Sequence, residues 1–98
     1  MDNAGEEPTV VPIEAELDLH SFLPRDVASI VDAYLRAAAE AGLRDVRLVH
    51  GRGRGVQRGI VQAVLAAHPL VERFHDDPRA HLGATIARIR TGTGRGEG

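Results

Sequence analysis

The segment from Ile13 to His20 constrains the fold of this chain more than any other stretch of its 98 residues. Its apolar residues are Ile13, Ala15, Leu17 and Leu19, and its polar residues are Glu14, Glu16, Asp18 and His20. Because the two kinds alternate, the segment predicts a β-strand at 13–19 with one apolar and one polar face. Asp18 and His20 share the polar face, so we expect both side chains to point the same way at the strand end.

Two segments with helical periodicity follow this strand. Pro24 favours a first helical turn, Gly42 favours a helix end, and apolar residues between them repeat at helical spacing. These residues are Val27, Ile30, Val31, Tyr34, Leu35 and Ala38. A second stripe, ended by Pro69, consists of Val56, Ile60, Val61, Val64, Leu65 and His68. We therefore predict helices near 24–41 and 56–68.

Three further segments predict strands, at 46–50, 70–75 and 84–90. The first of them is mostly apolar, as expected for a central strand. The predicted order is β-α-β-α-β-β, which indicates an α/β (α+β) fold with two helices on one face of a four-stranded mixed sheet.

The connection between the first two predicted strands places the candidate site. A helical crossover joins these strands, so we expect them to be parallel. Their C-terminal ends then lie at the same edge of the sheet. This arrangement brings Asp18 and His20 close to His50 and the loop that follows it, at the edge where open α/β sheets bind ligands.

The composition indicates one globular domain, which we place at 13–90. We expect a flexible arm at 1–12 and a disordered, glycine-rich tail at 91–98. The absence of cysteine excludes disulfides and thiolate metal sites. No apolar run approaches the ~20 residues of a membrane span, and the acidic N-terminus does not resemble a signal peptide. We therefore predict a cytoplasmic location.

The loop after the second predicted strand alternates glycine with arginine and leads into the second predicted helix. Amides at a helix N-terminus attract anions, glycine allows close backbone approach, and arginine adds positive charge. The candidate phosphate-binding residues are Gly51, Arg52, Gly53, Arg54, Gly55 and Arg58. The loop matches neither the G-x-G-x-x-G fingerprint nor the Walker A loop, which needs a lysine that the chain lacks. An ordinary flexible turn is the alternative interpretation.

The distribution of charge also favours a negatively charged partner. The net charge of −2 alone argues against a nucleic-acid binder, and six of the 14 acidic residues lie in the first 18. Between Arg44 and Arg58, however, there are five arginines and one aspartate, so the local balance is +4. All 12 basic residues are arginine, which suits bidentate phosphate contacts, although a GC-rich genome also explains the missing lysines.

Asp18, His20 and His50 are the candidate catalytic residues. An aspartate beside a histidine can orient the ring and make it a usable acid or base near neutral pH. Asp18 could instead hold a divalent ion such as Mg²⁺ or Mn²⁺. The alternatives are a solvated strand end for the first pair and a satisfied strand-end side chain for His50. We expect His68 to interact with the helix dipole, and the two remaining histidines to be exposed.

Four segments in order along the chain resemble the Smr (small MutS-related) domain family. They are Leu17 to His20, Val46 to Gly55, His68 to Val71 with Phe74, and Gly83 to Ile86. The resemblance covers about residues 13–90. It implies a two-layer α/β sandwich similar to the C-terminal domain of bacterial translation initiation factor three.

The resemblance also implies a function and site residues. The family is associated with DNA or RNA binding, and several members nick nucleic acids. It implies roles for Asp18, His20, His50, Gly51, Arg52, Gly53 and Gly55. Two departures concern Ser21, where members often carry glycine, and Ala80-His81, where members usually carry two glycines.

The predicted function is therefore that of a nucleic-acid-binding domain acting as a structure-selective nicking endonuclease in DNA repair, recombination or RNA processing. The partners are DNA or RNA, read through backbone and shape, and the resemblance adds a partner ATPase of the MutS type. The alternative is a non-catalytic module that binds nucleic acid or protein. Aromatic residues make up 3% of the chain, which leaves few platforms for base stacking.

Overall fold

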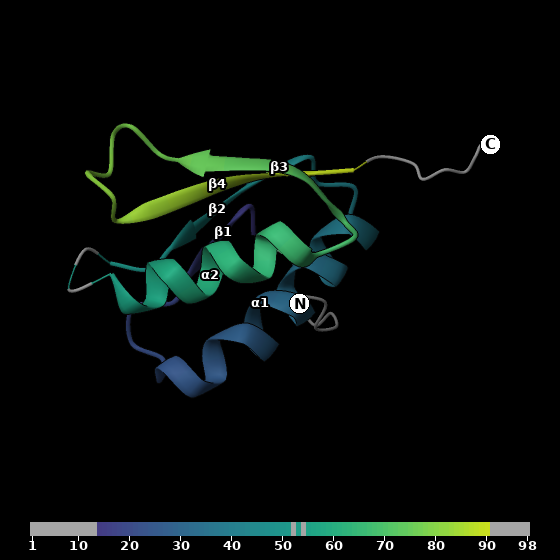
Figure 1. Ribbon diagram of the computed structural model, residues 1–98. Coiled ribbons are helices and arrows are strands. Elements are labelled where there is room, and N and C mark those ends of the chain that lie inside the picture. The colour runs from purple at the N-terminus through teal and green to yellow at the C-terminus, as the bar shows by residue number, and fades with distance from the viewer. Residues whose placement is uncertain (1–13, 52, 54, 91–98) are drawn as a thin grey trace, which may run out of the picture.

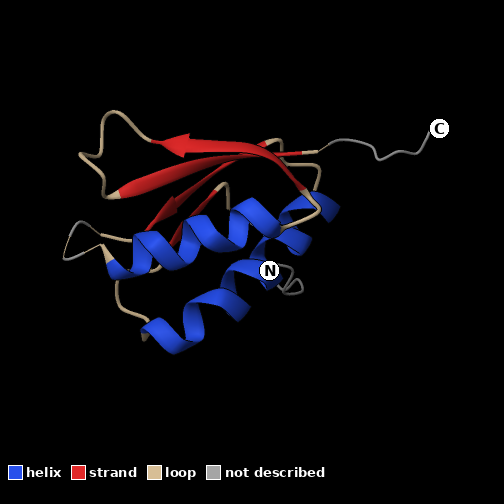
Figure 2. Cartoon of the chain, in the orientation of Figure 1, coloured by secondary structure: helices blue, strands red, loops and turns tan. Residues whose placement is uncertain are grey.

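The computed structural model describes residues 14–51, 53 and 55–90. The elements are β1 (Glu16–Asp18), α1 (Pro24–Glu40), β2 (Asp45–Val49), α2 (Val56–Ala67), β3 (Val71–Asp76) and β4 (Ala84–Ile89). Figures 1 and 2 show one layer of two helices packed against one layer of sheet. The predicted order β-α-β-α-β-β and the two-layer architecture are confirmed. The arm predicted at 1–12, the tail predicted at 91–98, and Ile13, Arg52 and Arg54 lie outside the described residues.

The four strands form one mixed sheet in the order β1-β2-β4-β3. Strands β1 and β2 are parallel, with Leu17 opposite Leu48 and Asp18 opposite Val49. Strand β4 pairs antiparallel with both β2 and β3. The predicted parallel pairing is confirmed, so the C-terminal ends of β1 and β2 lie at the same edge of the sheet. In Figure 1 this edge faces the loop between β2 and α2, at the left.

The first strand is shorter than its alternating pattern predicts. Within the described residues β1 spans only Glu16–Asp18, because its ladder with β2 covers three residue pairs. Leu19 then leaves the strand, although its N–H still donates to the Val49 carbonyl at 2.6 Å. The Phe22 N–H donates to the Leu19 carbonyl at 3.0 Å and begins the turn into α1. The other boundaries differ from the predictions by at most one residue, as is usual at element ends.

The core lies between the helices and the sheet. It consists of Leu19, Val27, Val31, Tyr34, Leu35, Ala38, Val46, Leu48, Val61, Leu65, Val71, Ala87 and Ile89. Both predicted helical stripes contribute to it, and so do the strand residues that face the helices. Burial raises the pKa of Tyr34 to about 12, and its hydroxyl donates a hydrogen bond to the Glu14 carbonyl. This bond fixes the chain just before β1.

His68 connects the two helices at the end of α2. Its ring is 8% exposed, and its Nε2 lies 2.7 Å from Asp32 Oδ1 on α1. Its Nδ1 accepts the Leu70 N–H at 3.1 Å, so Nε2 carries the proton that is donated to Asp32. The structure thus gives His68 a more specific partner than the predicted helix dipole. His75 and His81 are exposed, as predicted.

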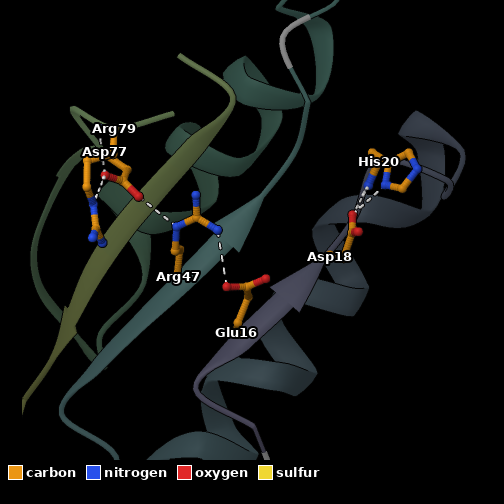
Figure 3. A network of polar contacts seen from close by, with 6 residues as sticks. All are labelled: Glu16, Asp18, His20, Arg47, Asp77 and Arg79. Atoms are coloured by element: carbon orange, nitrogen blue, oxygen red, sulfur yellow. Dashed lines mark hydrogen bonds and ion pairs between the residues drawn. The ribbon is translucent and has the colours of Figure 1, made fainter. Parts of the chain in front are cut away.

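An ion-pair network on the other face of the sheet anchors the β3–β4 connection (Figure 3). Arg47 on β2 donates to Asp77 Oδ2 at 2.6 Å and to Glu16 Oε1 at 3.1 Å. Asp77, which is 1% exposed, also accepts the Arg79 N–H at 2.9 Å. These hydrogen bonds, that from Arg47 first, lower the pKa of Asp77 below its ordinary 3.8. The start of the connection is thereby fixed to the central strand.

No helix in the described part of the chain is both long and apolar enough to cross a membrane.

Candidate functional site

Asp18 and His20 form a hydrogen-bonded pair at the end of β1 (Figure 3). Leu19 between them is fully buried, so both neighbours point outward. Asp18 Oδ1 lies 2.6 Å from His20 Nδ1 and also accepts the His20 backbone N–H at 3.0 Å. The bonds from His20 lower the pKa of Asp18 below 3.8, which keeps the carboxylate charged at neutral pH. The predicted common orientation is confirmed, and His20 Nε2 has no hydrogen-bond partner among the described residues.

The glycine loop leaves β2 next to this pair. The N–H groups of His50 and Gly51 both donate to the Gly83 carbonyl at 3.0 Å, which ties the loop to β4. A Cβ at Gly51 would lie 3.5 Å from the His20 Cβ, so the loop backbone passes directly beside His20. The predicted proximity of Asp18 and His20 to the loop after β2 is therefore confirmed.

All three glycines of the loop have positive φ. The angles are +81° at Gly51, +29° at Gly53 and +81° at Gly55. Residues other than glycine rarely adopt positive φ, so the path of the backbone explains why glycine occupies every second position. A Cβ at Gly53 or Gly55 would meet no described atom within 4 Å, which leaves the loop open to a ligand.

A cavity of about 300 Å³ joins these elements. Its lining residues are His20, His50, Gly51, Gly53, Gly55, Val56 and Gln57. Helix α2 begins at this cavity with Gly55 as its N-cap, without a side-chain cap and without an acidic residue in its first turn. The first-turn amides of such a helix are free to bind an anion. Helix α1, in contrast, carries Asp26 in its first turn.

His50 lies in the cavity wall but is 4% exposed. Its Nδ1 is 3.1 Å from the Gly51 carbonyl, and its Nε2 is 2.9 Å from Thr85 Oγ1. Burial lowers the pKa of His50 below its ordinary 6.5, so the ring is neutral at neutral pH. Both ring nitrogens are engaged, as the alternative interpretation of a satisfied strand-end side chain expects. A proton-transfer role for His50 stays a prediction.

The positive charge of the 44–58 segment is partly neutralised. Arg58 donates to both Asp76 oxygens, at 2.9 and 2.7 Å, and these bonds lower the pKa of Asp76. Arg47 is bound to Glu16 and Asp77 on the other face of the sheet. Neither arginine is among the described residues that line the cavity. The predicted phosphate contacts of the remaining loop arginines concern residues outside the described part of the chain.

Three residues of this region were missed in the sequence. Thr85 and Gln62 contact the His50 network, and Gln57 donates to the Phe22 carbonyl, which ties the start of α2 to the β1–α1 connection. Thr85 carries one signal that could have identified it, because it is a polar residue between the apolar residues Ala84 and Ile86 of its strand. The two glutamines carry none, since helix positions of this kind are usually solvated.

No group of three or more potential metal-ligating side chains occurs in the described ranges. The two hydrogen bonds of Asp18 both use Oδ1, so Oδ2 is the atom that a cation would contact. Binding of Mg²⁺ or Mn²⁺ by Asp18 stays a prediction.

Comparisons with known proteins agree with this fold. The family model of the Smr domain matches residues 17–91. Endonuclease MutS2 of Thermomicrobium roseum is 39% identical over 83 residues, which are 83% of this chain and 10% of that protein. Endonuclease MutS2 of Caldicellulosiruptor saccharolyticus is 35% identical over 80 residues, which are 80% of this chain and 10% of that protein. The chain thus spans about a tenth of the length of these relatives.

Two solved structures have the same fold. The Smr domain of Thermus thermophilus MutS2 superposes with a TM-score of 0.74 at 32% identity, over 76% of this chain and 96% of that one. YdaL, a stand-alone small MutS-related protein from Escherichia coli, gives a TM-score of 0.72 at 25% identity, over 78% of this chain and 64% of that one. The family model covers most of the chain, and the fold and the order of the motifs agree with it: the chain belongs to the Smr domain family.

Proposed function

We propose that this Smr domain binds nucleic acid through its phosphate backbone and hydrolyses a phosphodiester bond at the cavity. One observation carries the proposal. His20, oriented by Asp18, lines the same cavity as the uncapped N-terminus of α2. A proton-transfer group within reach of a bound phosphate is the minimum that a hydrolytic site requires.

The proposed reaction gives a role to each part of the site. The amides at the start of α2, together with Arg52 and Arg54, hold the phosphate and stabilise the charge of the transition state. His20 Nε2 takes a proton from the attacking water as the new P–O bond forms. The bond to the leaving oxygen breaks, and that oxygen takes a proton from the resulting imidazolium. Asp18 orients the ring through Nδ1 and stabilises its protonated form.

The curated relatives support this proposal, since they are named endonuclease MutS2. They are about eight times as long as the chain, since the match covers 80% of this chain and 10% of that protein. A role in DNA repair, recombination or RNA processing, and cooperation with a MutS-type ATPase, are therefore further parts of the proposal.

A second candidate is binding without cleavage. The side chains of His20 and Asp18 are 65% and 53% exposed. Water screens so exposed a pair, which weakens the activation of the ring. This observation favours a domain that grips phosphates and leaves catalysis to another part of a larger assembly.

A cleavage panel separates the two candidates. Supercoiled, linear and branched DNA and an RNA of matched length are incubated with the protein in Mg²⁺, in Mn²⁺ or in EDTA. We expect His20→Ala to lower nicking by about 10²- to 10⁴-fold and to leave binding nearly intact, because the imidazole adds little to backbone affinity. His75→Ala is the matched control, since His75 is an exposed histidine on β3.

Two results would decide against cleavage by this site. A His20→Ala protein that nicks at the wild-type rate, after a second purification has removed contaminating nuclease, excludes the pair from the mechanism. Binding without any nicking in the whole panel supports the non-catalytic candidate. Both candidate functions require phosphate contacts, which release counterions. An affinity for nucleic acid that does not weaken as salt rises would therefore contradict both functions.

A further inference from the structure

A chain of buried and partly buried hydrogen bonds runs behind the glycine loop. His50 Nε2 is 2.9 Å from Thr85 Oγ1, and Gln62 Nε2 on α2 is 3.1 Å from the same hydroxyl. Thr85 is fully buried on β4, and Gln62 is half-buried. Gln62 Nε2 also lies 3.0 Å from Asp76 Oδ1. The chain therefore links α2, β3, β4 and the end of β2.

The partners at the two ends assign every proton in this chain. The Gln62 amide nitrogen only donates, so Thr85 accepts its hydrogen bond and keeps its own hydroxyl proton to donate. In a neutral ring that carries its proton on Nδ1, Nε2 is an acceptor, so Thr85 donates to it. The Gly51 carbonyl only accepts, so His50 Nδ1, at 3.1 Å, must carry the ring proton. Asp76 accepts from Gln62 and from Arg58, which fixes the orientation of the glutamine amide. One neutral tautomer of His50 satisfies all of these bonds.

The tautomer matters for the cavity because of the Gly51 carbonyl. A carbonyl oxygen aimed at a bound phosphate would repel it. The Nδ1–H of His50 engages this oxygen, while the Gly51 N–H is held by the Gly83 carbonyl at 3.0 Å. The Gly51 residue is thus held from both sides at a φ of +81°, next to His20.

We infer that Thr85 and Gln62 are positioning residues of the anion site: together with the Gly51 carbonyl they stabilise the Nδ1–H tautomer of His50, which keeps that carbonyl turned away from a bound phosphate and orients the loop. The inference rests on the proposed function in that the anion is a nucleic-acid phosphate. It assigns His50 a positioning role in place of proton transfer. Arg58 donates to Asp76, which also accepts from Gln62, so Arg58 belongs to this positioning network and not to the phosphate contacts.

The test compares Thr85→Val, which removes the hydroxyl and keeps the shape, with Thr85→Ser, which restores it. Gln62→Leu removes the second member of the chain. Ile89→Val is the matched control, because Ile89 is a buried residue of the same strand outside the network. Two quantities are measured: the His50 tautomer, by long-range ¹H–¹⁵N NMR, and the affinity for a DNA duplex at two salt concentrations.

We expect the Nδ1–H tautomer in the wild type, in Thr85→Ser and in Ile89→Val, and a lower population of it in Thr85→Val, where only the Gly51 carbonyl still favours it. Affinity for DNA should fall about tenfold in Thr85→Val, the factor for one lost hydrogen bond, and recover in Thr85→Ser. Gln62→Leu should give a smaller loss in the same direction. The tautomer is read without DNA, so it remains decisive if the wild type binds no nucleic acid and the proposed function fails.

An unchanged tautomer in Thr85→Val would overturn the inference. The inference would also fail if Thr85→Val lowered the tautomer population but bound DNA as tightly as Ile89→Val, because the network would then have no effect on the site. If Thr85→Val does not fold, Gln62→Leu takes its place and is judged by the same two measurements.

Discussion

Asp18 Oδ1 and His20 Nδ1 lie 2.6 Å apart, and the same oxygen accepts the backbone N–H of His20. The pair is formed by residues two positions apart, Asp18 at the end of β1 and His20 just after it, so it requires no contact from elsewhere in the fold. The fold adds the position of the ring beside the loop. A Cβ at Gly51 would lie 3.5 Å from the His20 Cβ. A locally defined acid–base pair is thereby placed against a phosphate-binding loop.

The first prediction concerns the charge of Asp18. An asparagine side chain at this position would keep an oxygen that can accept the Nδ1–H of His20 but would lack the carboxylate charge. We expect Asp18→Asn to impair nicking less than His20→Ala and to leave DNA affinity nearly unchanged. The measurement is the initial nicking rate of supercoiled DNA with Mg²⁺, with Mn²⁺ and with EDTA.

The metal dependence separates two roles of Asp18. If Asp18 only orients His20, wild-type activity survives EDTA. If it also holds a cation through Oδ2, the activity that remains in Asp18→Asn depends more weakly on Mg²⁺ or Mn²⁺. An Asp18→Asn protein with wild-type rates under all conditions would contradict both roles.

The second prediction concerns the loop arginines. The double variant Arg52→Ala with Arg54→Ala should weaken DNA binding by roughly 1–3 kcal/mol and flatten the salt slope by about two, one for each lost phosphate contact. Stability should barely change, because loop arginines are usually solvated. Affinity is measured by titration over a series of salt concentrations, and stability by urea unfolding.

A control with the same change in net charge is Arg36→Ala with Arg73→Ala. These side chains are 62% and 64% exposed and lie outside the cavity lining, so the salt slope should stay close to that of the wild type. Arg58→Ala should behave differently again, because it breaks the pair with Asp76 and lowers stability. Equal slopes for the two double variants would place the phosphate contacts elsewhere.

The order of elements could be predicted because its signals are local. Alternation at Ile13–Leu19 and the two helical stripes need no knowledge of the fold, and the crossover rule then makes β1 and β2 parallel. The proximity of Asp18 and the glycine loop follows from that pairing. Thus the part of the site that depends on strand ends could be predicted before the structure.

The part of the site that depends on pairing between distant residues could not be predicted from the sequence. Arg47 meets Asp77 across 30 residues of chain and Arg58 meets Asp76 across 18, so a count of charges between 44 and 58 overstates the charge available to a phosphate. The burial of His50 depends on the register of β4, which places Thr85 opposite the end of β2. Neither the register nor these partners has a signal in local periodicity.

The third prediction concerns pH and His50. The folded-state pKa of His50 is lowered by burial, so between this value and 6.5 the unfolded chain binds more protons than the folded one. The free energy of unfolding therefore rises with pH in this window. The contribution of His50 is fully present above about pH 6.5 and is lost as the pH falls towards its folded-state pKa.

Urea unfolding between about pH 5 and pH 8 measures this dependence. His50→Gln should lose less stability than the wild type on acidification, since it has no group to protonate there. The carboxylates with lowered pKa values lose their contributions only below about 3.8, outside the window. His75→Gln, at an exposed position, should keep the wild-type slope. Identical slopes for the wild type and His50→Gln would show that burial of His50 does not control this pH dependence.

The fourth prediction concerns backbone strain in the β3–β4 connection. His81 and Leu82 have φ values of +49° and +70°, in the left-handed region that favours glycine. The Smr resemblance places two glycines at Ala80-His81, so the strained pair overlaps the position where this chain departs from its family. The strain is retained because Asp77 and Gly83 fix the connection on both sides, through the Asp77–Ala84 and Gly83–Ala80 backbone bonds.

Leu82→Gly should relieve this strain. A left-handed residue other than glycine costs about 1–2 kcal/mol, and the added freedom of glycine in the unfolded chain offsets about 0.4–1 kcal/mol of the gain. Leu82 is 53% exposed, so little apolar burial is lost with its side chain. We expect a net increase of about 0.5 kcal/mol in the free energy of unfolding, measured in urea. Leu82→Ala removes the same side chain but keeps the Cβ, so it should show no increase. If Leu82→Gly is no more stable than Leu82→Ala, the left-handed conformation of residue 82 carries no net cost to stability.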